Sequence, residues 1–192
     1  MKHLLFLFAF SFYTTIAFGQ ITKGNWLVGG NFDLYQNTEN YNSSTLKIDS
    51  KHTVINVSAN IGYFVMDRLA FGLKPTFSSI KGEGINGSGS STNFQIYRLG
   101  PFGRYYFLDT KKQYNILIDM SYQLGVLVIE RKKIESKQRN LSLLVGPVIY
   151  FNSSVGLEFL MGYNNIINNL DGTESTSKRF QIVIGFQIHL IK

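Results

Sequence analysis

The sequence predicts an all-β fold, an eight-stranded antiparallel up-and-down transmembrane β-barrel. Apolar and polar side chains alternate with period two in eight separate segments, which is the pattern of strands with two unlike faces. The connections between these segments are alternately long and short, as in membrane barrels with long loops at one end and short turns at the other. Glycine and polar residues collect on one strand face, and bulky apolar residues collect on the other.

Residues 1–19 are expected to be a signal peptide, which leaves one barrel domain over residues 20–192. A basic start is followed by an apolar run over 4–18 that ends with small residues at Ala17 and Gly19, as signal peptides do. This run is short for a membrane-spanning helix, which needs about 20 apolar residues. The sequence contains no cysteine, which excludes a lipid-anchored lipoprotein, a disulfide framework and thiolate metal sites.

Composition also favours insertion as strands. Beyond residue 19 no apolar stretch is as long as a spanning helix, so the exported chain is either soluble or a closed barrel in lipid. Charged residues make up 16% of the chain and aromatic residues 15%, whereas soluble domains average about 25% charged residues. Few charges and many aromatics suit a surface that contacts lipid.

The strands are predicted in order along the chain. The expected segments are 25–35, 53–63, 69–78, 97–107, 114–130, 141–151, 155–163 and 180–190. Residues 93–96, just before the fourth segment, do not keep its alternation and predict a β-bulge. Long polar loops are expected over 36–51, 79–92, 130–139 and 165–178, and shorter turns over 65–68, 108–113 and 152–154.

The glycines decide which face is inside. Strand glycines share the polar face, apart from Gly30 and Gly103. The interior of an eight-stranded barrel is just wide enough for side chains to fill, so small residues belong inside and bulky ones outside. A soluble ligand-binding barrel would show the reverse. Aromatics at the strand ends predict two interfacial girdles, one with Trp26, Tyr63, Phe107 and Phe151 and the other with Phe77, Tyr97, Tyr163 and Phe180.

With these features in place, the chain resembles the small outer-membrane β-barrel family, related in shape to OmpA-type and opacity-type porin-family barrels. The stretches that carry the resemblance are the signal ending AFGQ (17–20), KGNWLVGGNFDLY (23–35), GYFVMDRLAFGL (62–73), GPFGRYYF (100–107), VGPVIYF (145–151) and SVGLEFLMGY (154–163). The resemblance implies a Gram-negative outer membrane, periplasmic termini, and contact with lipid and with the barrel insertion machinery. The last aromatic is Phe186, so recognition by that machinery is expected to be weaker or shifted.

Six charged residues fall on the predicted inner face: Asp33, Lys74, Arg98, Arg104, Asp119 and Glu158. Isolated buried charges are too costly to desolvate, so we expect these to pair. Counted from the short turns, Arg104 and Glu158 lie about four residues up, and Lys74 and Asp119 about six. A charge network that plugs the lumen is the preferred interpretation, and a hydrated conducting lumen is the alternative.

Catalytic, metal-binding and cofactor signals are weak. Metal sites need several converging ligands, and His52 and His189 have no suitable partner spacing. The predicted lipid face carries no Ser–His–carboxylate grouping that would make a hydrolase relay. The glycine-rich stretch 81–92 lacks the helix start and Lys-Ser/Thr pair of a phosphate loop, so it is predicted to be a surface loop. No cofactor and no enzymatic activity are expected.

The formal charge of +7 is partly carried by a basic stretch at 131–139. Its cations are Arg131, Lys132, Lys133, Lys137 and Arg139. A solvated extracellular loop is the simplest interpretation, and contact with the phosphates of lipopolysaccharide is a second one, since Lys and Arg bind phosphate by charge-assisted hydrogen bonds. Nucleic acid is excluded as a partner by the expected location.

The predicted role is structural or interactive: membrane integrity, adhesion, or ligand binding by the extracellular loops. The first alternative is a narrow pore or a route for small solutes, including hydrophobic ones through a side opening. The second alternative is a lipid-modifying enzyme. The sequence does not indicate a ligand or an oligomeric state.

Overall fold

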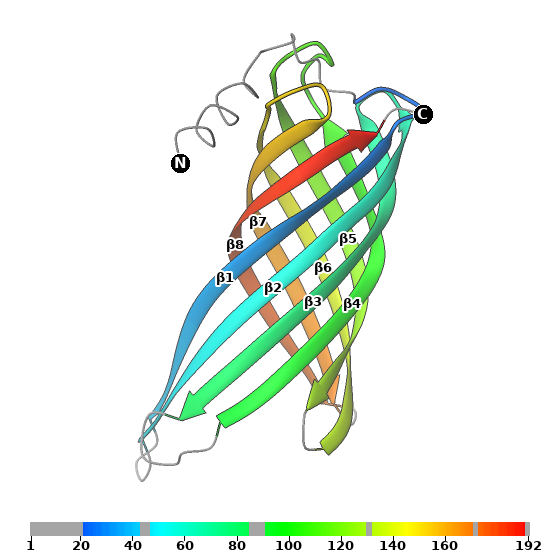
Figure 1. Ribbon diagram of the computed structural model, residues 1–192. Helices are drawn as coiled ribbons and strands as arrows, with labels where there is room; N and C mark the ends of the chain where they lie inside the picture. Colours follow the sequence, from blue (N-terminus) through cyan, green and yellow to red (C-terminus); the bar gives the residue numbers. More distant parts are fainter. Residues whose placement is uncertain (1–20, 43–46, 85–90, 130–131, 171–172, 191–192) are drawn as a thin grey trace, which may run out of the picture.

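Eight antiparallel strands close into a barrel in chain order in the structure, a computed structural model (Figure 1). Residues 21–42, 47–84, 91–129, 132–170 and 173–190 are described. The strands are β1 (Trp26–Asn42), β2 (Lys47–Met66), β3 (Leu69–Gly84), β4 (Ser91–Tyr106), β5 (Tyr114–Ile129), β6 (Lys132–Tyr150), β7 (Val155–Leu170) and β8 (Thr173–Leu190). The predicted eight-stranded antiparallel up-and-down barrel is confirmed. The signal peptide lies outside the described residues and stays a prediction.

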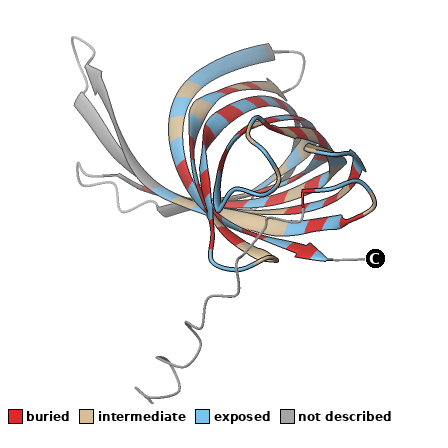
Figure 2. Ribbon diagram, turned by 90° about the horizontal axis from the view of Figure 1, so that it is seen from above, coloured by how far each residue is buried: buried red, intermediate tan, exposed pale blue. Residues whose placement is uncertain are grey.

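Each strand has one face in the lumen and one face outside. Buried and exposed residues alternate along the strands (Figure 2), because successive side chains of a strand point to opposite sides. Outward-facing Leu99 and Ile182 are 54% and 67% exposed, whereas the inward-facing Asp119 and Gln187 are fully buried. The polar face is therefore the interior, as the sequence predicted. Within the described residues, no helix is long and apolar enough to cross a membrane.

Short turns connect the strands at one end of the barrel, called here the short-turn end. Arg68, between β2 and β3, adopts a positive φ of 68°, and its backbone bonds to Ile21 O and Tyr106 N fix it against two neighbouring segments. Between β6 and β7, Asn152 Oδ1 accepts hydrogen bonds from the backbone of Ser154 and Val155, both at 2.8 Å. An asparagine that bonds the backbone two residues on is a common turn former.

The opposite end, called the hairpin end, differs from the prediction. The segments 36–51, 79–92, 130–139 and 165–178 were expected to be long loops, but most of their described residues continue the strands. β1 pairs with β2 as far as Asn42↔Lys47, and β7 pairs with β8 as far as Leu170↔Thr173. Strand pairing is made by backbone hydrogen bonds, so it continues into segments that have no apolar face.

The bulge expected at 93–96 is also wrong. β3 and β4 stay in one register from Leu69↔Tyr105 to Glu83↔Ser91. Ile96 is simply an apolar residue on the inner face, where it is buried together with Val54 and Ile166. The register shifts that the structure does contain lie in β2, between Phe64 and Met66, and at Leu127–Ile129 of β5.

Aromatic residues form two rows on the outer surface. Near the short turns Trp26 and Tyr63 stack edge to face at 5.4 Å, and near the hairpin end Phe77 lies 5.3 Å from Tyr97. Tyr163 and Phe180 form a similar pair in β7 and β8 at 5.3 Å. Tyr97 on β4 and Phe107, the residue that follows β4, are ten residues apart, which is about 25 Å across a tilted sheet. That height matches the apolar band of outer-membrane barrels.

The closing pair of strands has the shortest ladder. β1 and β8 pair only from Trp26↔Leu190 to Phe32↔Ile184, whereas β1 pairs with β2 along its whole length. Beyond the last pair of this ladder, Phe32↔Ile184, the two strands diverge toward the hairpin end, which is at the bottom of Figure 1. We call the line along which they face each other the β1–β8 seam.

Candidate functional site

Four buried charges meet in the lumen and form a compact network. Arg104 on β4 donates from Nη1 to Glu158 Oε1 at 2.5 Å and from Nε to Asp119 Oδ2 at 3.0 Å. Lys74 on β3 forms an ion pair with Asp119 Oδ1. The four side chains are at most 5% exposed. Two cations and two carboxylates balance in this network, which offsets the cost of removing each of them from water.

Strand register explains why these residues meet. Arg104 and Asp119 are direct partners across the β4–β5 pair, and side chains directly opposite each other on one face interact most strongly. Phe102, two residues further along the same face, lies 5.4 Å from Lys74 Nζ and 5.9 Å from the Arg104 guanidinium. A ring face at that distance attracts both cations.

A layer of aromatic and polar side chains, called here the aromatic layer, fills the lumen between this network and the short turns. Gln187 accepts a hydrogen bond from Tyr106 Oη at 2.5 Å and donates one to Tyr150 Oη at 3.1 Å. His189 lies below, with its ring 5.4 Å from Phe64 and 5.7 Å from Tyr150. All five of these side chains are buried, so side chains fill the lumen at this level.

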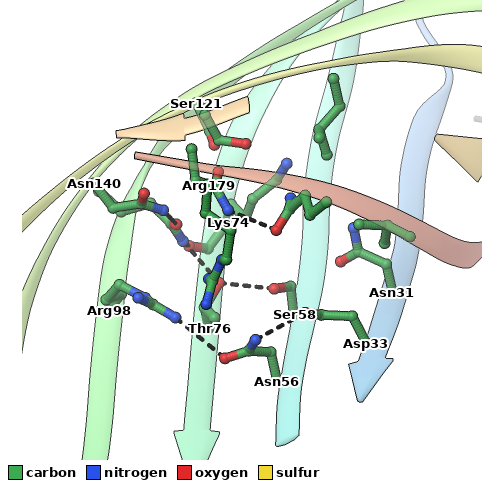
Figure 3. A pocket seen from close by; sticks show the side chains of 16 residues that line it. Asn31, Asp33, Asn56, Ser58, Lys74, Thr76, Arg98, Ser121, Asn140 and Arg179 are labelled. Carbon is green, nitrogen blue, oxygen red and sulfur yellow. Dashed lines mark hydrogen bonds between the residues drawn. The ribbon is translucent and has the colours of Figure 1, made fainter. Parts of the chain in front are cut away.

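The other two predicted charges, Asp33 and Arg98, form a separate group nearer the hairpin end. Arg98 donates to Ser78 Oγ at 2.5 Å and to Gln138 Oε1 at 2.9 Å. Asn56 lies between the two charges and bonds both, Asp33 at 2.9 Å and Arg98 at 3.5 Å (Figure 3). Among the described residues, the hydrogen-bond partners of Arg98 are thus neutral side chains.

A small polar cavity of about 40 Å³ separates the two groups. Its wall includes Asn31, Ser58, Thr76 and Ser121 (Figure 3). A cavity of that size has room for only a few water molecules. The lumen is therefore filled by side chains around a small polar space.

Three lumen residues were not among the predicted site residues. Arg179 lines the cavity from β8, but the sequence suggested that this strand began at residue 180. Tyr106 and Gln187 complete the layer below Arg104. All three share the period-two face of the predicted charges. Tyr106 and Gln187 lie within the predicted segments 97–107 and 180–190, and extending the parity of the last segment by one residue reaches Arg179.

The basic stretch 131–139 is part of a strand and not a loop, which corrects the prediction. Lys132 to Arg139 belong to β6, and Arg131 lies outside the described residues. The side chains of Lys132 and Lys133 are also outside the described set. Lys137 and Arg139 are exposed on the outer face, and Arg139 forms an ion pair with Glu174 at 2.5 Å. Arg139 lies two residues beyond the apolar Leu141, at the edge of the apolar surface.

The described residues contain no group of three or more His, Cys, Asp and Glu placed to hold a metal ion. His52 falls on β2, but its side chain is outside the described set. His189 is enclosed in the aromatic layer.

Comparison with known proteins supports the architecture. No protein-family model and no curated protein matches the chain. The crystal structure of Neisserial surface protein A (NspA) is similar with a TM-score of 0.56 and 20% identity, covering 86% of this chain and 97% of that one. The outer membrane protein OprG from Pseudomonas aeruginosa is similar with a TM-score of 0.51 and 10% identity, covering 89% and 98%. The chain has the fold of the small outer-membrane β-barrels.

Proposed function

We propose that the protein is an outer-membrane barrel with a structural or surface-interaction role, anchored by its strands and presenting long hairpins outside the cell. One observation carries the proposal: an outer face of exposed apolar residues, including Leu99, Met120 and Ile184, lies between two aromatic rows. Soluble proteins rarely expose apolar patches larger than a few hundred Å². In an outer membrane, lipid tails would surround this apolar surface and keep it away from water.

The lumen favours this role over an axial pore. A charge network and an aromatic layer fill the cross-section, and eight strands leave space only for side chains. We therefore propose a barrel that does not conduct ions along its axis. The surface for partners is then the hairpin end, where the strands run to 16–20 residues, well beyond the roughly 9–11 residues that cross a membrane.

Cell fractionation tests the location. The protein is expected in the outer-membrane fraction after carbonate extraction, and boiled and unboiled samples should migrate differently on a denaturing gel. Orientation is tested with an epitope inserted between β3 and β4, which should be accessible to antibody on intact cells. Recovery of native protein from the soluble periplasmic fraction would contradict the proposal.

Lipopolysaccharide is the surface ligand that we propose for the basic part of β6. Lys137 and Arg139 lie at the edge of the apolar band on the outer face, where phosphates of the inner sugars would be found. The variant Lys137→Gln/Arg139→Gln should bind lipopolysaccharide less tightly at low salt, and the difference should shrink as salt rises. Lys81→Gln on β3, another exposed cation, is the matched control. If the β6 variant and the Lys81→Gln control bound lipopolysaccharide equally tightly at low salt, Lys137 and Arg139 would not form a lipopolysaccharide site.

A further inference from the structure

The chain makes a tight turn at the short-turn end of the barrel, just before β1 begins. In this turn Asn25 donates to Thr22 twice, from its backbone N to Thr22 O at 3.3 Å and from Nδ2 to Thr22 Oγ1 at 2.9 Å. Gly24 has a φ of 96°, and a positive φ at the third residue is what a type II turn requires. The turn therefore reverses the chain and directs Ile21 back toward the barrel.

Hydrogen bonds fix this segment to the end of β2 and to the β2–β3 turn. They are Gly24 N to Phe64 O at 2.9 Å, Lys23 N to Asp67 Oδ1 at 2.8 Å, and Arg68 N to Ile21 O at 2.8 Å. The ladder between β1 and β2 begins only at Trp26↔Tyr63. The contacts of Ile21 and Lys23 are therefore additional to the strand pairing that closes the barrel.

Arg68 is strained, and its strain is connected to this segment. Its φ of 68° lies in the left-handed region, which is unfavourable for a residue with a Cβ. Strained residues persist where their surroundings hold them. The backbone N of Arg68 bonds Ile21 O, and its backbone O accepts a hydrogen bond from Tyr106 N at 2.9 Å. The β2–β3 turn thus links Ile21 to the end of β4.

The side chain of Ile21 is fully buried, although the residue belongs to no strand. It forms part of one buried cluster with Leu27, Phe64, Tyr106 and Tyr150. These partners face the lumen at the short-turn end, and the outer face of the barrel is exposed. Ile21 therefore covers the aromatic layer from the side of the short turns.

The aromatic layer contains a histidine that makes this cover important. Both ring nitrogens of His189 are buried and have no hydrogen-bond partner among the described residues, and the rings of Phe64, Tyr106 and Tyr150 surround it. Buried polar atoms are normally bonded, and water is a good partner for them. Water that entered from the short turns would find two free nitrogens here, so this level of the lumen hydrates readily unless its end is closed.

We propose that residues 21–25 form a stopper, a strap that closes the short-turn end of the lumen. Ile21 is its apolar tip, and the β2–β3 turn is the latch that holds it. Because the barrel ladders do not include Ile21, the stopper can leave the lumen while all eight strands stay paired. In the proposed membrane location this end faces the periplasm, so the stopper controls whether periplasmic water and small solutes reach the aromatic layer.

Thiol labelling tests the stopper, because the chain has no cysteine of its own. Ala70 on β3 is fully buried in the same cluster, so the Ala70→Cys variant reports access from the short turns. Folded protein in detergent micelles should react slowly with a small water-soluble methanethiosulfonate. Adding Ile21→Ala should raise the labelling rate about tenfold or more, because most of a buried side chain is lost. Ile21→Val removes one methylene and should raise it by no more than about fourfold.

A second reporter separates opening of one end from loosening of the whole barrel. Ser121 is 2% exposed on β5, on the hairpin side of the charge network, and its Oγ has no partner among the described residues, so Ser121→Cys loses no hydrogen bond. Ile21→Ala should leave the labelling rate of this variant unchanged. Equal acceleration at both reporters would overturn the proposal, and so would an unchanged rate at Ala70→Cys.

The turn itself provides a third arm. A Cβ at Gly24 would meet only Tyr63 Oη, at 4.0 Å, so Gly24→Ala acts through the unfavourable positive φ and should speed labelling of the Ala70→Cys variant about fivefold or more. Lys23→Ala keeps the backbone N–H that bonds Asp67 and is the matched control. Equal labelling rates for these two variants would mean that the turn does not hold a stopper.

The migration shift on boiling confirms that each labelled sample is folded. Labelling in micelles does not depend on where the protein resides in the cell. Folded protein that labels equally with and without Ile21→Ala therefore contradicts the stopper alone, whereas recovery from the soluble fraction contradicts the membrane location alone.

Discussion

Arg104 bonds partners on three different strands, because it contacts Asp119 on β5, Glu158 on β7 and Gln187 on β8. Arg104→Ala leaves the buried Glu158 without its cation, while Asp119 keeps Lys74, and loss of one partner of a buried pair typically costs about 3–5 kcal/mol. We expect the midpoint of urea unfolding to fall by a corresponding amount. The double variant Arg104→Ala/Glu158→Gln should recover part of the loss. A single variant as stable as the parent would mean that the network does not stabilise the barrel.

Two glycines of β4 allow a matched test of strand packing. A Cβ at Gly100 would lie 1.9 Å from the backbone oxygen of Tyr122, whereas a Cβ at Gly103 would meet only the ring of Phe71, at 3.0 Å. Gly100→Ala is therefore expected to destabilise the barrel by about 1–3 kcal/mol. Gly103→Ala should cost less, because a ring can move and a strand backbone cannot. Similar unfolding free energies for the two variants would contradict this.

The sequence predicted which charged residues face the lumen, but it did not predict that they form two separate groups. Parity alone placed Lys74, Arg104 and Asp119 on one face, and counting from the turns placed them at similar heights. It did not reveal that Asp33 and Arg98 are linked through Asn56. That arrangement depends on side-chain conformations across three strands, which alternation does not encode.

At the scale of one element, the outward-facing side of β5 tests whether the outer surface of the barrel contacts lipid. Met120 is 55% exposed and pairs with Gly103, about midway between the aromatic rows. Met120→Arg should cost about 2–4 kcal/mol at the bilayer midplane, measured by unfolding in vesicles. Met120→Leu is the control and should be nearly neutral. If both variants were equally stable, this face would not contact lipid.

The hairpin ends show where strand prediction from sequence stops. The alternation of β7 and β8 ends near Tyr163 and Phe180, although their pairing continues to Leu170↔Thr173. In the proposed membrane location, both faces of a strand meet water beyond the aromatic row, so side chains no longer need to alternate. The apolar pattern therefore marks only the part of each strand between the aromatic rows and underestimates strand length.

For the whole molecule, the sequence predicted strand number, connection order and the inside face, because these follow from period two and from the turns. It did not predict the short β1–β8 ladder, since the seam residues alternate as regularly as those of any paired strand. The difference between paired and open strands lies in tertiary geometry.

A conductance measurement tests the barrel as a unit. Purified protein in a planar bilayer is expected to give no steady current, because Arg104, Tyr106 and Gln187 fill the lumen. Reconstitution should be verified by the migration shift on boiling. A stable, ion-selective current through the parent protein would favour the pore alternative.

The lumen network also has a consequence for assembly. Arg104 is 54 positions from Glu158 and 83 from Gln187 along the chain, so these two partners arrive only with the last two strands, whereas Asp119 is 15 positions away. The chain loses conformational entropy when these distant strands are brought together, and it does so before the contacts of Arg104 with Glu158 and Gln187 form. A partial sheet would carry uncompensated charge into the lipid and is expected to be expelled. In the proposed membrane location, we therefore expect the network to make barrel closure cooperative, because Glu158 and Gln187 reach Arg104 only when β7 and β8 are in place.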